Sequence, residues 1–353
     1  MQNIQTLQAF LDASGAQYRI YDLGRRVIKI SKDLFEKIEH TQAPYPYPLQ
    51  RHAWFGILFW NPKDKEQHHI WFLKFPLDEQ GFLDLPARND FLRRALEQLG
   101  QAIIESKDGK SKNEDRELKD NPWSYTPRQD KMAAFHAKAL VELKQPGSQY
   151  LHDVLNYLQQ PNQFSQWQHI GVQGIADLCA RSDTGNVSTL LAKNLTLLPN
   201  DVLIPILLGL ENETIDHKLT QAIIACATVD GSTTNNVTLL AAIIRAMSGT
   251  QDNQTRDAFI YKVLTESTSA ALSIEVLVAI SGRAWDALLE EKIALAFLEA
   301  LALSDAGQSG FNHVLTDVLF MPTTGKIIRQ AFRSTERSEQ LAQTIGSFLS
   351  GIH

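Results

Sequence analysis

The chain has 353 residues and a formal net charge of −6, with 44% hydrophobic and 21% charged residues. These proportions are those of an ordinary globular protein, and the length predicts about two domains. The only two cysteines, Cys179 and Cys226, lie outside any Cys-x-x-Cys pair, which excludes a disulfide framework and a zinc ribbon. No leader-like opening and no apolar run long enough to span a bilayer occur, so we expect a cytoplasmic protein without a membrane partner.

The negative charge is concentrated in the second half of the sequence. Residues 149–353 carry 12 Lys/Arg against 20 Asp/Glu, whereas residues 1–148 carry 22 against 20. An acidic half repels phosphate backbones, so we expect no nucleic-acid binding there. The same charge favours a basic protein partner.

The first part of the chain predicts a mixture of helices and strands. Residues 4–13 have the apolar spacing of a short amphipathic helix, which Gly15 ends. Residues 17–30 alternate as one or two strands around a turn at 22–24, and residues 33–40 are typical of one or two helical turns.

Prolines at alternate positions of the segment 44–48 (Pro-Tyr-Pro-Tyr-Pro) exclude a helix and favour extended polyproline II backbone. We interpret it as a connector over the surface. The alternative is a ligand for a proline-recognising domain, which requires that its tyrosines do not pack on their own domain.

Residues 51–60 and 68–75 are rich in aromatic and β-branched residues and predict a hairpin with a polar turn at 61–67. Both faces of these strands are apolar, so both must be covered. A helix predicted over 89–104 and its neighbours can cover one face. The second face needs the helical half, further local helices or a second subunit, so a homo-oligomer formed through the hairpin is one expectation.

Residues 105–122 predict a flexible linker or long loop. Eleven of the 17 residues from 105 to 121 are charged, with mixed signs, and too few are apolar to bury a core. A helix predicted over 128–143 follows it. The expected organisation is an α+β domain over 1–104, the linker over 105–122, and an all-α domain over 123–353.

From Tyr150 onward the pattern predicts helices almost exclusively. Apolar segments recur about every 16–20 residues, which gives two helices per roughly 35 residues, the period of α-solenoids. The expected fold is thus an α+β domain with a small antiparallel sheet, followed by stacked helices. These form either a HEAT- or armadillo-like solenoid or an irregular helical bundle.

Two groups of polar residues near the hairpin are candidates for ligand binding. Arg25 and Arg26 suggest an anion pocket; the alternative is that Asp22 caps the turn while an arginine pairs with a carboxylate. Asp78 and Glu79 have the composition of an acid/base pair, but adjacent carboxylates at a turn are usually solvated. No catalytic residue, metal site or cofactor is predicted from any motif.

Large aromatic residues in the acidic half are candidates for binding a protein partner. Phe164, Trp167 and Trp285 lie near predicted helix starts, where such rings can anchor a partner in a concave groove. The alternative is that they pack between neighbouring helices.

Three segments carry a family resemblance: Asp22-Leu23-Gly24-Arg25-Arg26, the Pro44–Pro48 run, and Ile70-Trp71-Phe72-Leu73-Lys74-Phe75-Pro76-Leu77-Asp78-Glu79-Gln80-Gly81. The chain resembles an uncharacterised gammaproteobacterial family of unknown function. The resemblance implies a bacterial cytoplasmic protein of about this length, and it brings no activity.

The function that these patterns favour is a protein–protein interaction or scaffold protein that uses a helical-repeat surface. The alternative is an enzyme or small-molecule sensor with its site at the junction of the N-terminal and helical domains. The sequence favours the first, because no catalytic constellation accompanies the repeated helices.

Overall fold

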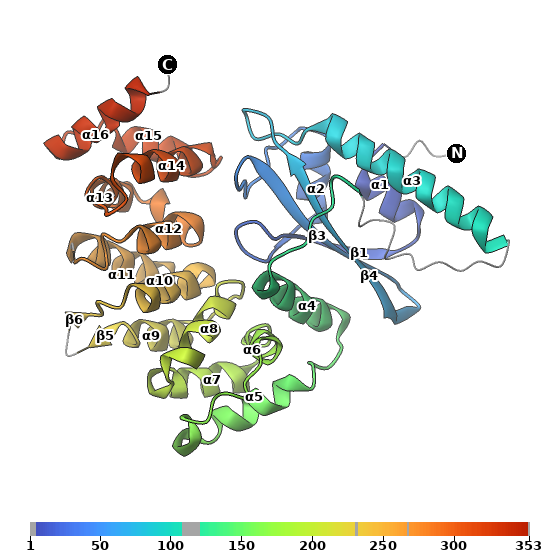
Figure 1. The fold of residues 1–353 in the computed structure, drawn as a ribbon, viewed down its shortest axis with the longest axis horizontal. Coiled ribbons are helices and arrows are strands. Elements are labelled where there is room, and N and C mark those ends of the chain that lie inside the picture. Colours follow the sequence, from blue (N-terminus) through green and yellow to red (C-terminus); the bar gives the residue numbers. More distant parts are fainter. Residues whose placement is uncertain (1–4, 108–120, 230–231, 267, 352–353) are drawn as a thin grey trace. The chain divides into compact units, whose positions relative to one another are not determined.

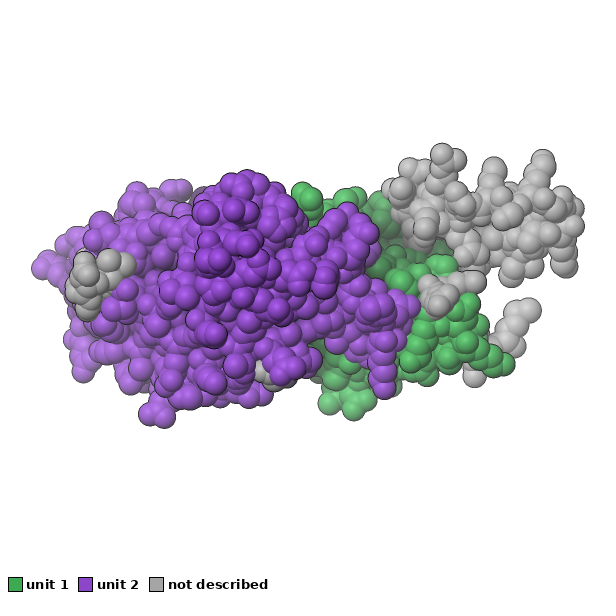
Figure 2. All heavy atoms as spheres, turned by 90° about the horizontal axis from the view of Figure 1, so that it is seen from below, with its two compact units in different colours: residues 1–131 green, residues 132–353 purple. Residues whose placement is uncertain are grey.

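The structure is a computed structural model that describes residues 5–107, 121–229, 232–266 and 268–351. The chain divides into two compact units, residues 1–131 (the N-terminal unit) and residues 132–353 (the helical unit), coloured separately in Figure 2. An antiparallel sheet with helices forms the first, and many helices form the second, which confirms the predicted fold class (Figure 1).

The N-terminal unit contains one four-stranded sheet and its helices. Their bounds are α1 (Leu7–Ala13), β1 (Gln17–Asp22), β2 (Ile28–Ile30), α2 (Lys32–Glu39), β3 (His52–Asn61), β4 (Asp64–Pro76) and α3 (Leu85–Lys107). Helix α4 (Gln129–Leu143) begins in this unit and continues in the next.

The sheet has the strand order β2-β1-β3-β4, with every pair antiparallel. The predicted hairpin is confirmed, but its turn is shorter than the sequence indicates, because Asn61 already pairs with Asp64. Polar side chains do not prevent backbone pairing, so residues 64–67 extend β4 instead of forming a loop.

Helices α1, α2 and α3 cover one face of the sheet. Phe35 of α2 packs edge-on against Phe55 of β3, and Phe10 of α1 and Phe91 of α3 both pack against Trp71 of β4. Such aromatic pairs stabilise the fold beyond the contribution of the apolar area that they bury. Nearby helices therefore cover this face, as expected.

The opposite face carries Trp54 and Phe72, and Tyr125 packs edge-on against both rings. The segment that holds Tyr125 continues the sheet, because Leu73 pairs with Ser124 and the Tyr125 N–H donates to the Phe72 carbonyl at 3.1 Å. The N-terminal unit consequently extends to residue 131, whereas the sequence suggests an all-α domain from residue 123. Of the predicted linker, residues 108–120 lie outside the described residues.

The helical unit contains α-helices joined by short loops and 3₁₀ turns. The bounds of the first group are α5 (Tyr150–Leu158), η2 (Pro161–Gln163), α6 (Val172–Cys179), α7 (Gly185–Asn194), η3 (Leu195–Leu197), α8 (Asn200–Leu210) and α9 (His217–Ala225). Those of the second are α10 (Val237–Ala246), η4 (Met247–Gly249), α11 (Asn253–Glu266), α12 (Ile274–Gly282), η5 (Trp285–Leu289), α13 (Glu291–Ala302), α14 (Gly307–Phe320), α15 (Gly325–Ala331) and α16 (Glu339–Ser350).

A short hairpin between α9 and α10 departs from the expectation of an all-α half. Strands β5 (Thr228–Val229) and β6 (Ser232–Thr233) pair in antiparallel fashion. A hairpin this short gives little signal in the hydrophobic pattern.

None of the helices in the described residues combines the length and apolar character that crossing a bilayer requires.

Alternate helices of this unit pack on one another in two rows. Helices α6, α8, α10, α12, α14 and α16 contact each other in succession, and so do α7, α9, α11, α13 and α15 (Figure 1). In α8, α10 and α12 the C-terminal ends lie together, since Glu211 binds both Arg245 and Arg283, so equivalent turns of these helices lie side by side.

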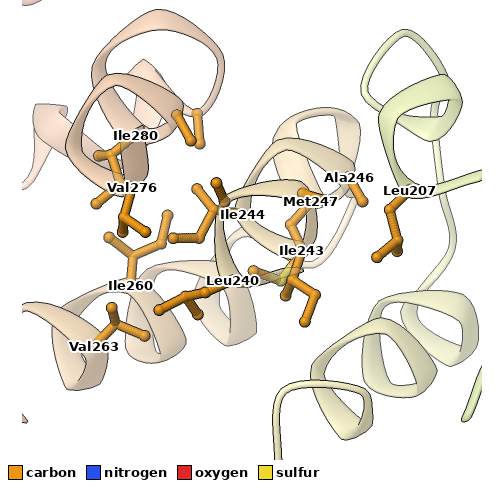
Figure 3. Close-up of a cluster of buried hydrophobic side chains, with 14 of the residues drawn as sticks. Leu207, Leu240, Ile243, Ile244, Ala246, Met247, Ile260, Val263, Val276 and Ile280 are labelled. Carbon is orange, nitrogen blue, oxygen red and sulfur yellow. The ribbon is translucent and has the colours of Figure 1, made fainter. Parts of the chain in front are cut away.

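One continuous core runs between the two rows. Helix α10 contributes most of its residues to it, since neighbours in its own row and helices of the other row surround it. Figure 3 shows α10 side chains gathered with those of α8, η4, α11 and α12: Leu207, Leu240, Ile243, Ile244, Ala246, Met247, Ile260, Val263, Val276 and Ile280.

Candidate functional site

A groove crosses three successive helices of one row, α8, α10 and α12. Its volume is about 200 Å³. Buried alanines of α10 and α12 line it together with Val278 of α12, which is 47% exposed. The apolar strip of the groove consists of Ile204, Leu208, Ala241, Ala242, Val278 and Ala279.

Arg245 and Arg283 line the end of the groove at the helix C-termini, and both bind Glu211. The Oε2 atom of Glu211 accepts hydrogen bonds from Arg245 Nε at 2.6 Å and from Arg283 Nε at 3.2 Å. The Glu211 side chain is only 2% exposed, whereas the two arginines are 25% and 21% exposed. The buried Glu211 carboxylate thus connects the C-terminal ends of α10 and α12 through Arg245 and Arg283.

The opposite end of the groove lies at the first turns of α10 and α12. Thr238 and the exposed Glu275 line it. The Ser273 hydroxyl caps α12 by accepting the Glu275 N–H. The groove is thus an apolar strip with Arg245 and Arg283 at one end and Glu275 at the other.

Glu213 lies in the loop that follows α8, and its carboxylate accepts a hydrogen bond from Lys138 Nζ at 2.7 Å. The side chain is 11% exposed, and burial raises its pKa to about 7, against the opposing effect of Lys138. This loop is fixed where the Ile215 N–H donates to the Gly249 carbonyl at 3.2 Å. The carboxyl group therefore changes charge near neutral pH.

The predicted anion pocket at Arg25 and Arg26 is an enclosed turn in the structure. Asp22 Oδ2 accepts the backbone N–H groups of Arg25 and Arg26 at 3.0 and 3.3 Å, and Oδ1 accepts that of Gly24 at 3.1 Å. Burial raises the pKa of Asp22, while its hydrogen bonds and the nearby Lys131 ammonium act in the opposite direction. Asp22 caps this turn, as the alternative interpretation states.

Tyr45 connects the three segments that carry the family resemblance. Its hydroxyl donates to Asp22 Oδ1 at 2.6 Å, and its backbone N–H donates to the Gly81 carbonyl at 2.8 Å. Arg25 Nε also donates to the Pro48 carbonyl at 2.8 Å. Because Tyr45 is fully buried against its own domain, the interpretation of this segment as a ligand for a proline-recognising domain is wrong.

Asp78 and Glu79 lie on an exposed turn directly after β4. Asp78 Oδ1 accepts the N–H groups of Gln80 and Phe82, both at 2.9 Å, so this carboxylate closes its own turn. Tyr45 brings this turn close to the Asp22 turn through Gly81, but the Asp78 hydrogen bonds stay within its own turn. This local bonding fits a structural role, and the ligand-binding role stays a prediction.

The three aromatic residues predicted to bind a partner differ in exposure. Phe164 and Trp285 are 6% and 3% exposed, and the Phe164 ring packs against Tyr157. Trp167 is partly buried against the same core. Packing between helices, the alternative interpretation, therefore describes Phe164 and Trp285 in this structure, and Trp167 is the most accessible of the three.

In the part of the chain that is described, no three His, Cys, Asp or Glu side chains are placed to share a metal ion. The groove residues, in contrast, were not recognised from the sequence. A signal exists for Arg245, because it is a lone basic residue inside the apolar segment 239–247. Glu211 and Arg283 lie just outside apolar segments, where charged residues are common.

A comparison with protein families places almost the whole chain in one of them. The family model described as "Protein of unknown function (DUF3549)" matches residues 2–349. No curated protein and no solved structure matches the chain.

Proposed function

We propose, given that the chain belongs to the DUF3549 family, that it is a helical-repeat scaffold that binds another protein in the groove across α8, α10 and α12. The proposed setting is the cytoplasm, where free thiols such as Cys179 and Cys226 persist.

The two rows of helices support the helical-repeat part of this proposal. Each helix contacts mainly the next member of its own row and its neighbours in the other row, as in solenoids. An array of this kind presents an extended surface across successive helices, and such surfaces commonly bind other proteins.

The observation that carries the proposal is the exposed apolar strip between two charged ends. Val278 leaves almost half of its surface in water above a floor of alanines. An apolar patch with a polar rim is the general anatomy of a protein interface. A volume of about 200 Å³ is also below the usual range of small-molecule pockets, roughly 300–1,000 Å³.

The experiment compares tagged full-length protein with two surface variants in affinity capture from the native lysate, quantified by mass spectrometry. Val278→Asp places a charge in the strip. Leu197→Asp places the same charge at a side chain that is 59% exposed and outside the groove. We expect a stoichiometric partner that Val278→Asp loses and Leu197→Asp keeps.

Both substitutions are at exposed positions, so we expect both variants to fold, which circular dichroism and thermal unfolding verify. Retention of every captured protein by folded Val278→Asp would contradict the proposal. Equal loss in both variants would contradict it as well, since the effect would then not depend on the groove.

The alternative of an enzyme or sensor built on Asp22, Arg25, Arg26, Asp78 and Glu79 gains no support from their positions. Asp22 accepts the backbone N–H groups of Arg25 and Arg26 within their own turn, and Arg25 Nε donates to Pro48 of the neighbouring connector. A homo-oligomer formed through the β3–β4 hairpin stays a prediction. Light scattering of the protein at tens of micromolar measures the oligomeric state and so tests it.

A further inference from the structure

We infer that a pocket between the segment leading into α1 and helix α3 binds a small carboxylate with an apolar tail, whose oxygens accept N–H groups of Arg88 and Asn89. This site goes beyond the proposed function, because its residues belong to the N-terminal unit whereas the groove belongs to the helical unit.

The pocket has the size of a small-molecule site. Its volume is about 450 Å³, within the usual range of roughly 300–1,000 Å³. The described residues that line it come from the residue before Thr6 and from α3 (Figure 1): Gln5, Arg88, Asn89, Leu92, Arg93 and Leu96. These are two cations, two amides and two leucines, and none of these described residues is acidic. Such a lining favours a ligand that combines an acceptor group with an apolar part.

Arg88 is held by bonds that leave part of its guanidinium group to a ligand. Its side chain is 5% exposed, Nη1 donates to the Glu39 carboxylate at 2.9 Å, and Nε donates to Asn89 Oδ1 at 2.8 Å. Among the described residues no hydrogen bond uses its Nη2 atom. Glu39 in turn accepts the backbone N–H groups of Leu7 and Gln8. The Nη2 donors are therefore fixed in position before a ligand arrives.

Asn89 supplies the second donor group. Because its Oδ1 accepts Arg88 Nε, its other terminal atom is the Nδ2 donor, which has no partner within the described part of the chain. Asn89 is exposed and lines the pocket, so Nδ2 can donate to a ligand. A carboxylate offers one oxygen to each donor group, and a guanidinium group binds a carboxylate more strongly than a neutral acceptor.

The acidic side chains close to the pocket already have cationic partners. Arg93 binds both Asp90 and Glu97, and Arg88 binds Glu39. These pairs leave little net charge, so selection rests on the N–H donors that line the pocket. A ligand whose own donors face them would leave polar groups unpaired, which costs binding free energy.

The test measures the binding of three probes to full-length protein by saturation-transfer NMR: sodium hexanoate, hexanamide and sodium acetate. Hexanamide has the same shape as hexanoate, but an amide donor replaces one acceptor oxygen. We expect the Kd of hexanoate to be at least roughly fivefold lower than that of hexanamide. Acetate lacks the apolar tail and should bind at least roughly tenfold more weakly than hexanoate.

Two variants of Leu96 connect this binding to the pocket, because Leu96 lines it and is 38% exposed. Leu96→Glu and Leu96→Gln remove the same apolar contact, but only the first adds a charge. We expect Leu96→Glu to weaken hexanoate at least roughly fivefold more than Leu96→Gln does. Leu197→Glu, at an exposed position of the helical unit, is the control and should leave binding unchanged.

Arg88→Lys tests the guanidinium group itself. Lysine keeps a cation beside Glu39 but has no second terminal nitrogen, so the preference for hexanoate over hexanamide should fall below about twofold. Thermal unfolding verifies that this variant folds. Should it fail to fold, the two Leu96 variants decide.

Three results would overturn the inference. Equal affinity for hexanamide and hexanoate would exclude selection of a carboxylate. Equal effects of Leu96→Glu and Leu96→Gln on hexanoate would place the bound molecule outside the pocket. Absence of saturation transfer to hexanoate at about 10 mM would exclude a carboxylate site altogether. None of these results bears on the capture experiment, which tests the groove separately.

Discussion

Tyr45 is the residue on which the N-terminal unit most visibly depends, because its hydroxyl donates to a fully buried carboxylate. We expect Tyr45→Phe to lower the free energy of unfolding by about 1–3 kcal/mol, since Asp22 loses a donor that buried water cannot easily replace. Urea unfolding of full-length protein measures this. Tyr150→Phe is the control, because Tyr150 is 46% exposed and should cost less than about 0.5 kcal/mol. Equal values for the two variants would refute the role of the hydrogen bond.

Glu213 gives the helical unit a specific dependence on pH. Its pKa of about 7 in the folded protein lies above its ordinary value of 4.5. The protonated form is therefore favoured by folding, and this stabilisation is complete below pH 4.5 and is lost as pH rises through 7. We measure the free energy of unfolding of the wild type and subtract that of Glu213→Gln. We expect this difference to fall by up to about 3 kcal/mol as pH rises over this range.

The comparison with Glu213→Gln is needed because other carboxylates act in the opposite direction. Hydrogen bonds lower the pKa of Asp252, so its contribution to stability disappears as pH falls. Subtracting the variant removes such shared terms. A difference that stays constant between pH 4.5 and 7.5 would show that Glu213 keeps an ordinary pKa.

Single residues illustrate the limits of sequence reasoning. The sequence offers the Asp22 cap as one of two interpretations, because an aspartate two residues before a glycine is a common turn signal. The bond from Tyr45 to Asp22 joins residues 23 positions apart. Local pattern carries no information on such a contact, and the same holds for Glu211 with Arg283, which are 72 positions apart.

At the scale of elements, a close approach at Gly249 ties the loop after α8 to the end of α10. A Cβ atom at this position would lie 1.9 Å from the Glu213 carbonyl oxygen, so the two backbones would have to separate. We expect Gly249→Ala to destabilise the protein by about 3 kcal/mol. Differential scanning calorimetry or urea unfolding measures the loss.

Gly346 in α16 is the matched control, because nothing lies within 4 Å of an added Cβ there. Gly346→Ala should raise stability by about 0.5–1 kcal/mol, since alanine loses less backbone freedom in a helix. Should Gly249→Ala prove neutral, the tight contact between the loop and η4 would be excluded.

Helices and strands were predictable where the hydrophobic period was strong. The pattern predicts a helix over 128–143 and the structure has α4 at Gln129–Leu143, because the spacing marks the buried face. The pattern failed where pairing depends on backbone alone. Polar residues 64–67 join β4, and the 123–125 segment joins the sheet edge although it is too short to give a strand pattern.

For the whole molecule, the sequence predicted two parts and a stack of helices from composition and period. It placed the boundary at the charged segment, whereas the compact N-terminal unit includes residues up to 131. The location of the groove could not be predicted from the sequence, because that prediction requires knowing which helices are neighbours in a row. Alternate packing brings together residues from α8, α10 and α12, which the chain separates by intervening helices.

The whole-molecule property that most needs a test is whether the helical unit unfolds as a solenoid or as one bundle. In an array whose members contact mainly their neighbours, helices near an end open at a lower free energy than those in the middle. Cys179 in α6 lies near the start of its row and is 1% exposed, and burial raises the pKa of its thiol well above its usual value. Its reaction with a thiol reagent at pH 8 therefore reports local opening, because the exposed thiolate is the reactive form.

Ser248→Cys supplies a matched thiol near the middle of the row, since Ser248 is 3% exposed directly after α10 and cysteine is close to serine in size. Cys226, which is less buried, is replaced by serine in both proteins, and Cys179 by alanine in the second. We expect the free energy of opening at Cys179 to be lower than that at Ser248→Cys by at least about 1 kcal/mol. Equal protection at both positions, matching the global free energy of unfolding, would mean that the helices unfold as one cooperative bundle, and the helical-repeat part of the proposal would then have to be abandoned.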